Sequence, residues 1–395
     1  MTTLHQLNGS CQKILRLRGC GLGTFASLLI LAVASHTQTF TVLHTFRGPD
    51  GSGPYSGLMR DSAGSLYGTT SGGGYSNAGV AFRLTLSGKE TAFSFNNTGG
   101  AGPLASLVSD GKGNFYGTTR SGGASGVGVV FKIAAPGTET VLYSFQGGTD
   151  GAFPYAELVL DAEGNLYGTT SDGGENGVGV VFKVTSNGTQ TVLHSFIGPE
   201  GAFPMAGLLR DPAGNLYGTT LDGGANGGGA LFRLSPNGQV MVLHDFCQPA
   251  NDCGDGANPD AHLVADRSGN LYGTTSAGGP SRKGVIFRLN RKGQYKVLYA
   301  FCSAQNCADG ATPYAGVSLD TVGNLYGTTT AGGNSGAGVV FKLDTHGHET
   351  VLHGFTGGSD GGVPLGGVVL DSQGNLYGTA FFGGLSDGVV FKITP

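Results

Sequence analysis

The stretch Leu166-Tyr167-Gly168-Thr169-Thr170 decides the fold, because it recurs with little change seven times along the chain. Its tyrosines are spaced by about 50 residues, which is the period of repeats that each form one small sheet. A repeat of this length indicates one structural unit that is copied and packed against its neighbours. The seven tyrosines are Tyr67, Tyr116, Tyr167, Tyr217, Tyr272, Tyr326 and Tyr377.

Each repeat contains four short runs rich in Val, Leu, Tyr, Thr and Phe, which favour strands, and the runs are separated by Asp, Asn and Gly, which favour turns. The unit is therefore predicted to be a four-stranded antiparallel sheet. In the clearest copy the runs are Leu158-Val159-Leu160, Leu166 to Thr170, Val180 to Lys183 and Thr191 to Phe196.

Seven such sheets predict an all-β, seven-bladed β-propeller, in which each four-stranded antiparallel blade packs on the next around a central channel. The chain supplies a spare fourth-strand sequence, Thr41 to Phe46, before the first repeat, and its last repeat stops after the third-strand sequence Val389 to Lys392. We expect the N-terminal strand to close the last blade. A β-solenoid is the alternative, but its coils are shorter and need no spare first strand.

The composition excludes other fold classes. Of 395 residues, 76 are Gly and only 12% are charged, whereas helical surfaces need Glu, Lys and Arg. The 39% of hydrophobic residues, including 22 Phe, supply a core that a disordered chain would lack. A formal net charge of −4 argues against nucleic acid or anionic lipid as a partner, because both select basic surfaces.

The first 34 residues have the pattern of a secretory signal peptide. Lys13, Arg16 and Arg18 precede an apolar run from Leu22 that ends in Ala32-Val33-Ala34. The run is too short to span a bilayer comfortably, so no membrane span is predicted. We expect a mature propeller over residues 35–395 that is secreted or resides in the periplasm or cell envelope.

Four cysteines follow the predicted signal peptide, and they stand as two close pairs. An even number of cysteines in an exported chain favours disulfides, and the most local pairing joins Cys247 to Cys253 and Cys302 to Cys307. A zinc site is the alternative, although the spacing lacks the usual Cys-x2-Cys form.

The repeated residues resemble a known family. One repeat runs from Pro154 through Asp161, Asn165 and the Leu-Tyr-Gly-Thr-Thr stretch to Gly-Gly and Gly-Val-Val-Phe-Lys. This pattern resembles the GloVer-type tandem repeat of exported bacterial proteins, and more distantly the NHL-like propeller repeats. The resemblance covers nearly all of the mature chain. It implies export and a propeller fold, and it supplies no catalytic residue.

Two sets of recurring polar residues are interpreted structurally. An aspartate begins the turn between the first two runs of every repeat, as Asp161 does, and its carboxylate is expected to accept turn amide bonds rather than to form a metal or catalytic ring. His44, His194, His244 and His353 recur in the fourth run and are expected on the outer-strand surface. We predict no metal and no cofactor.

The candidate site lies where the first strand of each blade enters the channel. At the position before the Leu of that strand, five blades carry Gly or Ser and two carry ionisable residues, Glu157 and His262. These two are the candidate catalytic pair, because a carboxylate beside an imidazole can perform general acid and base chemistry. Asp260 and Arg210 are expected nearby.

Aromatic residues are expected to surround the same mouth. Tyr55, Tyr155 and Tyr314 each follow a proline at the entry to a first strand, and with Asp260 they are the candidate ligand-binding residues. Tyrosines at such a mouth could stack on sugar rings or could simply pack the blade joints. The longer loops that share this face, including both cysteine segments, form a second candidate recognition surface.

Two functions remain open. The first is an exported, monomeric binding or scaffold module that presents its loop-rich face to a glycan, a peptide or an envelope protein. The near-uniform repeats favour this hypothesis, because an active site normally breaks the symmetry at several blades. The alternative is an enzyme acting on a carbohydrate or a lactone at the channel mouth. A propeller fold alone does not decide between them.

Overall fold

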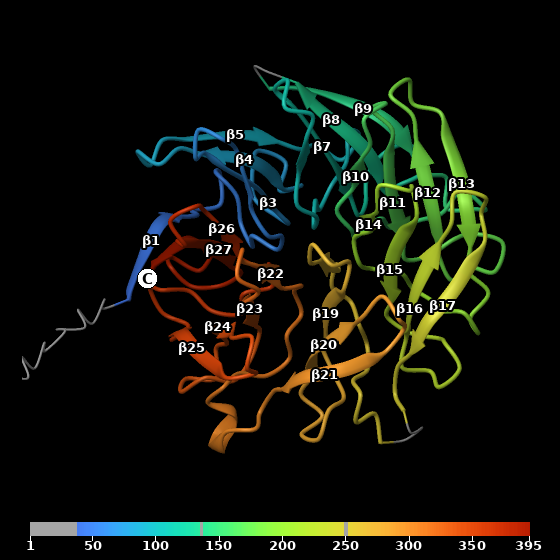
Figure 1. The fold of residues 1–395 in the computed structure, drawn as a ribbon. Helices are drawn as coiled ribbons and strands as arrows, with labels where there is room; N and C mark the ends of the chain where they lie inside the picture. The colour runs from blue at the N-terminus through green and yellow to red at the C-terminus, as the bar shows by residue number, and fades with distance from the viewer. Residues whose placement is uncertain (1–37, 135–136, 249–251) are drawn as a thin grey trace, which may run out of the picture. The chain divides into compact units, whose positions relative to one another are not determined.

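The computed structural model describes residues 38–134, 137–248 and 252–395, which form seven four-stranded antiparallel sheets in a ring (Figure 1). The predicted signal peptide, residues 1–34, lies outside the described residues. In the described part, one short 3-10 segment, η1 (Gln305–Cys307), accompanies the strands, and no helix there is long and apolar enough to cross a membrane. The prediction of an all-β, seven-bladed propeller is confirmed.

The blades follow one another in chain order, each with a two-residue innermost strand. Blade 1 comprises β2 (Met59–Arg60), β3 (Leu66–Thr70), β4 (Val80–Leu84) and β5 (Glu90–Ser94). Blade 2 comprises β6 (Val108–Ser109), β7 (Asn114–Thr119), β8 (Val129–Ala134) and β9 (Thr138–Ser144). Blade 3 comprises β10 (Val159–Leu160), β11 (Leu166–Thr170), β12 (Val180–Val184) and β13 (Gln190–Ser195).

Blades 4 to 7 repeat this arrangement. Blade 4 comprises β14 (Leu209–Arg210), β15 (Leu216–Thr220), β16 (Ala230–Leu234) and β17 (Val240–Asp245). Blade 5 comprises β18 (Val264–Ala265), β19 (Leu271–Thr275), β20 (Val285–Leu289) and β21 (Tyr295–Ala300). Blade 6 comprises β22 (Ser318–Leu319), β23 (Leu325–Thr329), β24 (Val339–Leu343) and β25 (Glu349–Gly354). Blade 7 comprises β26 (Val369–Leu370), β27 (Leu376–Ala380), β28 (Val389–Thr394) and β1 (Thr39–Thr45).

The ring closes as predicted. The N-terminal strand β1 pairs antiparallel with β28, with Phe40 opposite Ile393 and Thr45 opposite Val389. Figure 1 shows this blue strand beside the red C-terminal strands. Two ends of the described chain therefore share one sheet, and blade 7 has the same four strands as every other blade.

Phenylalanines hold neighbouring blades together. Phe182 on β12 and Phe196, directly after β13, are fully buried. The ring of Phe196 meets Phe232 of the next blade edge to face, with 5.2 Å between centroids. Such pairs contribute about 0.5–1.5 kcal/mol each beyond the burial of their surface. The same contact occurs at every seam, in the pairs Phe46–Phe82, Phe95–Phe131, Phe145–Phe182, Phe196–Phe232, Phe246–Phe287, Phe301–Phe341 and Phe355–Phe391.

The recurring glycine of the Leu-Tyr-Gly-Thr-Thr stretch makes room for this packing. A Cβ on Gly168 would lie 2.7 Å from Cζ of Phe182 on the neighbouring strand. That distance is far below a normal contact, so the ring and a side chain at this position cannot share the space. The glycine and the phenylalanine are thus one packing unit within each blade.

The recurring aspartate caps its turn, as predicted. Asp161 Oδ1 accepts a hydrogen bond of 2.8 Å from the Asn165 amide, and Oδ2 accepts 2.9 Å bonds from Asn165 Nδ2 and the Tyr167 hydroxyl. Burial alone would raise the pKa of Asp161, but these hydrogen bonds outweigh it and hold the pKa below its ordinary value. Equivalent tyrosine bonds are made to Asp61, Asp110, Asp211, Asp266, Asp320 and Asp371.

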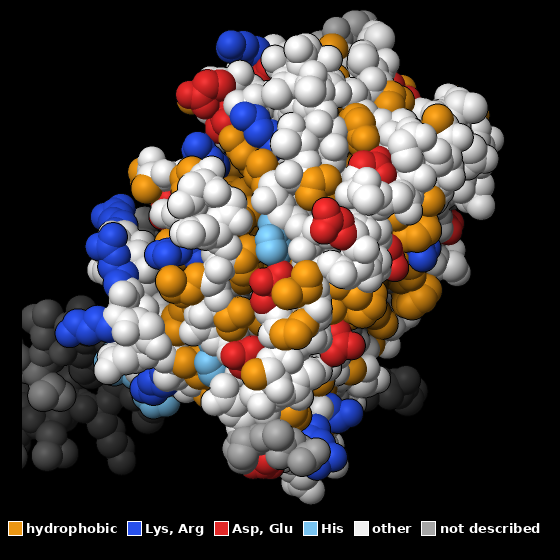
Figure 2. Space-filling model, turned by 90° about the vertical axis from the view of Figure 1, so that its right-hand side faces the viewer, with side chains coloured by type: hydrophobic (Ala, Val, Ile, Leu, Met, Phe, Trp, Pro, Cys, Tyr) orange, Lys and Arg blue, Asp and Glu red, His pale blue; other side chains and the backbone are white. Residues whose placement is uncertain are grey.

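The connections divide between the two faces of the ring. The loop that enters blade 3 pairs with the loop between its central strands through backbone bonds between Ala152 and Asp172. We call the face that carries these two kinds of loop the loop face. On the other face, the two short turns of blade 5 around Asp266 and Asn290 line one groove. On the side drawn in Figure 2, Lys and Arg lie mostly along one edge, while Asp and Glu are spread over the rest.

Both predicted disulfides are present. Cys247 is bonded to Cys253 in the loop after β17, and Cys302 to Cys307 in the loop after β21. Each bond closes a small loop at the start of a connection between blades, on the same side of the ring as the channel mouth described below.

Candidate functional site

The site is built from a repeated position at the channel mouth. In every blade, the residue after a recurring proline, as Tyr155 after Pro154, lines one cavity of about 430 Å³ on the channel axis. Because this position falls at the entry to the innermost strand, the seven blades place seven side chains around a single opening. They are Tyr55, Leu104, Tyr155, Met205, Asp260, Tyr314 and Leu365.

Three of these residues are the predicted tyrosines. Tyr55 and Tyr314 meet edge to face with 6.1 Å between ring centroids, and Tyr55 also meets Phe381 at 6.2 Å. The Arg120 guanidinium lies 5.3 Å from the centroid of Tyr155. Burial raises the pKa of Tyr55 and of Tyr314, so both phenols stay protonated and can donate hydrogen bonds at neutral pH.

Asp260 is the acidic member of this ring. Its side chain is buried, and its Oδ1 has no hydrogen-bond partner among the described residues. Burial raises the pKa of Asp260 to about 7, against the opposing effect of hydrogen bonds that include Ser276. A carboxyl group in this state can accept a hydrogen bond when ionised and donate one when protonated.

Glu157 and His262 lie together on the same cavity, in the next ring of residues. Oε1 of Glu157 is 3.7 Å from Nδ1 of His262, and both side chains are about one-third exposed. The structure therefore brings the predicted pair together across the intervening blade 4. Their catalytic role stays a prediction.

Glycines in the same ring make space for this pair. A Cβ on Gly207 would lie 2.6 Å from Cγ of Glu157, and a Cβ on Gly316 would lie 3.0 Å from Cε1 of His262. The two large side chains, Glu157 and His262, fit only because the neighbouring positions in this ring hold glycine. A propeller with seven large side chains here would have no space for them.

Arg210 is not part of the site, contrary to expectation. Its guanidinium lies 5.6 Å from the ring centroid of Tyr167, and it lines the groove on the opposite face instead of the channel cavity. Arg60 lines the cavity, and Arg120 lies against Tyr155. A signal for Arg120 exists in the sequence, because it follows Thr-Thr where the other blades have Ser71, Ser171, Leu221, Ser276, Thr330 and Phe381.

The outer-strand histidines are placed on the expected strands, but they are mostly buried. His44, His244 and His353 each hold an acidic residue of the following loop at 2.8–3.1 Å, and their side chains are 13–19% exposed. His194 pairs with Glu200 in the same way. One of these pairs, His44 with Asp50, also has Glu90 beside it, and the ligand atoms of all three lie within 4.8 Å of one another.

Comparison with known proteins identifies the repeat and the fold. The family model of the Gloeobacter/Verrucomicrobia repeat matches residues 23–211, 136–316 and 209–395, in agreement with the resemblance drawn from the sequence. A search of curated proteins found no match.

Several solved structures are similar. Virginiamycin B lyase from Staphylococcus aureus, in selenomethionine form, has a TM-score of 0.59 at 15% identity over 91% of this chain and 99% of that chain. A catalytically inactive variant of the same lyase, solved with quinupristin, has a TM-score of 0.60 at 14% identity, over 91% of this chain and 100% of that chain. A proposed 6-phosphogluconolactonase from Bacteroides fragilis has a TM-score of 0.51 at 19% identity, over 82% of this chain and 88% of that chain. At these identities the likeness extends to the fold alone.

Proposed function

We propose that this chain, which belongs to the Gloeobacter/Verrucomicrobia repeat family, is a binding propeller that holds the end of a glycan in its channel mouth. The observation that carries this proposal is the ring of Tyr55, Tyr155 and Tyr314 around one cavity, together with Asp260, whose Oδ1 has no partner among the described residues. Its volume of about 430 Å³ lies within the range of small-ligand sites.

A sugar fits the chemistry of this mouth. Tyrosine rings present apolar faces together with hydroxyl groups, and a sugar ring presents C–H faces edged by hydroxyls. Oδ1 of Asp260 lacks a partner within the described residues, and a sugar hydroxyl would supply one. A peptide or an envelope protein would instead use the wider loop face, including the two disulfide-bonded loops.

The test is retention on an array of bacterial and plant polysaccharides, followed by titration calorimetry with the oligosaccharide that is retained. Tyr155→Ala and Asp260→Asn should each weaken binding by about tenfold, the equivalent of about 1.4 kcal/mol. The control is Tyr75→Ala, because Tyr75 is 95% exposed and lies outside the cavity. Binding that survives both mouth substitutions would disprove the proposal.

A second candidate function rests on the 3.7 Å contact between Glu157 and His262. This pair could transfer a proton to or from a carbohydrate or lactone held at the mouth. The likeness to virginiamycin B lyase and to the lactonase-like propeller lends this candidate no residues. The masses of the carbohydrate or lactone after incubation with the chain distinguish the two functions. Shortened or ring-opened products that are absent with the double variant Glu157→Gly, His262→Gly would favour an enzyme. Unchanged masses with retained binding would favour the binding module.

Export is part of the proposal. Two disulfides favour an oxidising compartment, because cytosolic thiols are kept reduced. N-terminal sequencing of the protein recovered outside the cytoplasm should give a first residue near Ser35. Light scattering of the same sample tests the proposed monomer.

A further inference from the structure

A three-residue contact recurs at the seams between blades, on the outer wall of the ring. It combines a residue near the end of one outer strand, an acid in the loop that follows, and one of the first two residues of the next blade's outer strand. At the seam of blades 4 and 5, His244 holds Asp255 at 2.8 Å and stacks on Tyr295 at 3.8 Å. At the seam of blades 6 and 7, His353 holds Asp360 and stacks on Phe40.

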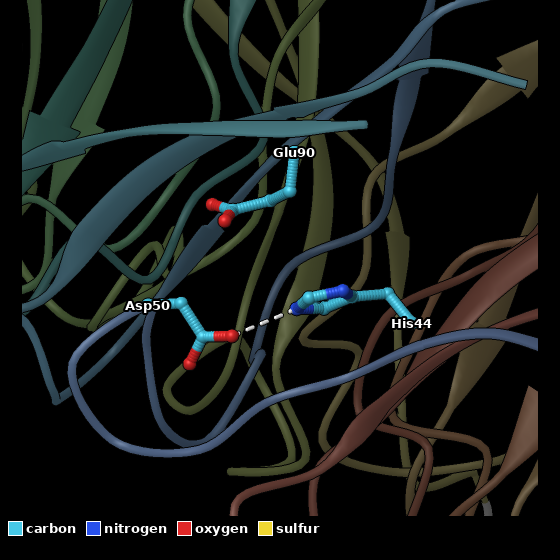
Figure 3. Close-up of side chains that lie close together, drawn as sticks. All are labelled: His44, Asp50 and Glu90. Atoms are coloured by element: carbon cyan, nitrogen blue, oxygen red, sulfur yellow. Dashed lines mark hydrogen bonds and ion pairs between the residues drawn. The ribbon is translucent and has the colours of Figure 1, made fainter. Parts of the chain in front are cut away.

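The seam of blades 7 and 1 differs in the third residue. Here His44 of β1 holds Asp50 at 3.0 Å between Nε2 and Oδ2, and the neighbouring residue is Glu90 at the start of β5. Figure 3 shows the three side chains converging, with the Glu90 carboxylate above that of Asp50. Glu90 Oε1 is buried and has no hydrogen-bond partner in the described part of the chain.

The other seams lack this combination. Glu139 and Glu349 occupy the position of Glu90 in blades 2 and 6. At these two seams, the outer strand of the preceding blade has Phe93 or Tyr299 at the position of His44. Where the outer-strand residue is His194, His244 or His353, the neighbouring position holds Val240, Tyr295 or Phe40. Within the described residues, one seam alone joins an imidazole to two carboxylates in this way.

We propose that His44, Asp50 and Glu90 bind a divalent cation of the zinc class. An imidazole nitrogen and two carboxylate oxygens are ligands that Zn²⁺ takes at about 2.0–2.2 Å, with a water in the fourth position. A calcium ion is disfavoured, because it requires six or more oxygens and rejects imidazole.

The geometry is close to what such an ion needs. Tetrahedral coordination at about 2.1 Å separates ligand atoms by about 3.4 Å. The His44–Asp50 contact of 3.0 Å must open by about 0.4 Å, and the three ligand atoms lie within 4.8 Å of one another. The Glu90 carboxylate needs to move by at most about 1.4 Å to reach the same separation, which rotation about its side-chain bonds provides.

Neighbouring groups orient two of the ligands. The backbone amide of Arg47 donates a 2.7 Å hydrogen bond to Asp50 Oδ1, which leaves Oδ2 for the ion. The Phe46 ring packs edge to face on His44 at 4.8 Å. Such outer contacts fix ligand orientation in metal sites. A bound ion would join the N-terminal strand of blade 7 to the outer strand of blade 1.

The test uses the purified chain, stripped with a chelator and titrated with Zn²⁺ by calorimetry. His346 and His348 are exposed beside Asp344 and could hold zinc on their own, so all variants carry His346→Ala and His348→Ala. In this background one Zn²⁺ should bind per chain. Glu90→Gln and Asp50→Asn should each weaken binding by about tenfold or more, since changes to outer contacts alone cost about this much.

Glu139→Gln is the matched control, because Glu139 occupies the same strand position without a histidine beside it, and it should leave binding unchanged. Co²⁺ in place of Zn²⁺ should give visible absorption bands, and Glu90→Gln should need at least about tenfold more Co²⁺ to reach them. Zn²⁺ should also raise the melting temperature of the chain more than that of Glu90→Gln at the same concentration, and the melt shows at the same time whether that variant folds. Absence of binding, equal binding by Glu90→Gln, or binding of Ca²⁺ in preference to Zn²⁺ would overturn the inference.

Discussion

At the scale of the residue, Asp260 combines a proposed binding role with burial that costs the fold stability. In the ring of seven mouth residues it is the one that carries an acid, and its Oδ1 has no partner among the described residues. The facing groups are Tyr55, Tyr314 and Ser276, none of which ionises near neutral pH. These three groups supply no positive charge to the carboxylate.

This state predicts a pH-dependent stability. The pKa of Asp260 is about 7 in the folded chain against an ordinary value of 3.8, so between these pH values the folded chain holds a proton that the unfolded chain has released. The free energy of unfolding therefore falls as pH rises through this window. Asp260→Asn should match the wild type near pH 4 and exceed it above pH 7, on the order of 2–4 kcal/mol.

Thermal melts of both proteins between pH 4 and pH 8.5 check this prediction. If the melting temperatures of the two proteins differ by the same amount at every pH, Asp260 does not cause the pH dependence of stability. A gain in stability above pH 7 would also show that weaker glycan binding by Asp260→Asn does not come from unfolding.

Much of the candidate site could be predicted from the sequence, because repeats align equivalent positions. Glu157 and His262 stand out where other blades have Gly or Ser, and the ring geometry brings them together. The expectation that Arg210 lies near the pair was wrong, because its guanidinium lies against Tyr167 and lines the groove on the opposite face. Sequence position alone does not give the direction of that side chain.

At the scale of the element, each blade depends on the close fit of a glycine and a phenylalanine. Gly168 on β11 faces Phe182 on β12, and the same phenylalanine contacts Phe145 across the seam. A side chain added at Gly168 would therefore displace the Phe182 ring and disturb its contact with Phe145 of the neighbouring blade.

Gly168→Ala should destabilise the chain by about 1–3 kcal/mol, because the added Cβ overpacks the core against Phe182. The matched control is Gly354→Ala on β25, where a Cβ meets nothing within 4 Å. Urea unfolding measures both. An equal loss in the two variants would mean that strand propensity, not the contact with Phe182, sets the cost.

The elements themselves follow from local sequence, but their packing does not. The strands and the Asp-x-x-Gly turns were predictable because β-branched and aromatic runs alternate with turn residues. The outer histidines were expected on the surface, yet the loop after each strand covers them with an acid. The position of Glu90 beside His44 depends on how blades 7 and 1 meet, and no short stretch of sequence contains that information.

At the scale of the whole molecule, closure depends on β1. Without it, β28 would be an exposed edge, and the Phe46–Phe82 contact between blades 7 and 1 would be lost. Because every seam carries an equivalent phenylalanine pair, stability should be shared evenly around the ring and should fail as a unit when one seam opens.

A chain that begins at Arg47 should lose cooperative unfolding and associate through the free edge of β28. Moving residues 39–46 behind Pro395 through a two-residue Asn-Gly turn should restore a single transition, because β1 and β28 are already antiparallel neighbours. Calorimetry and light scattering check both chains. A truncated chain that melts like the wild type would show that three strands suffice for blade 7.

The pairing of β1 with β28 also fixes the order of events during synthesis. The ribosome makes β1 before any blade is complete, and β28 emerges after the other twenty-seven strands that the structure describes. The strand β1 thus has no strand partner while β2 to β27 are being made. The ring therefore cannot close until β28 is available to pair with β1, so closure comes after the folding of the intervening blades.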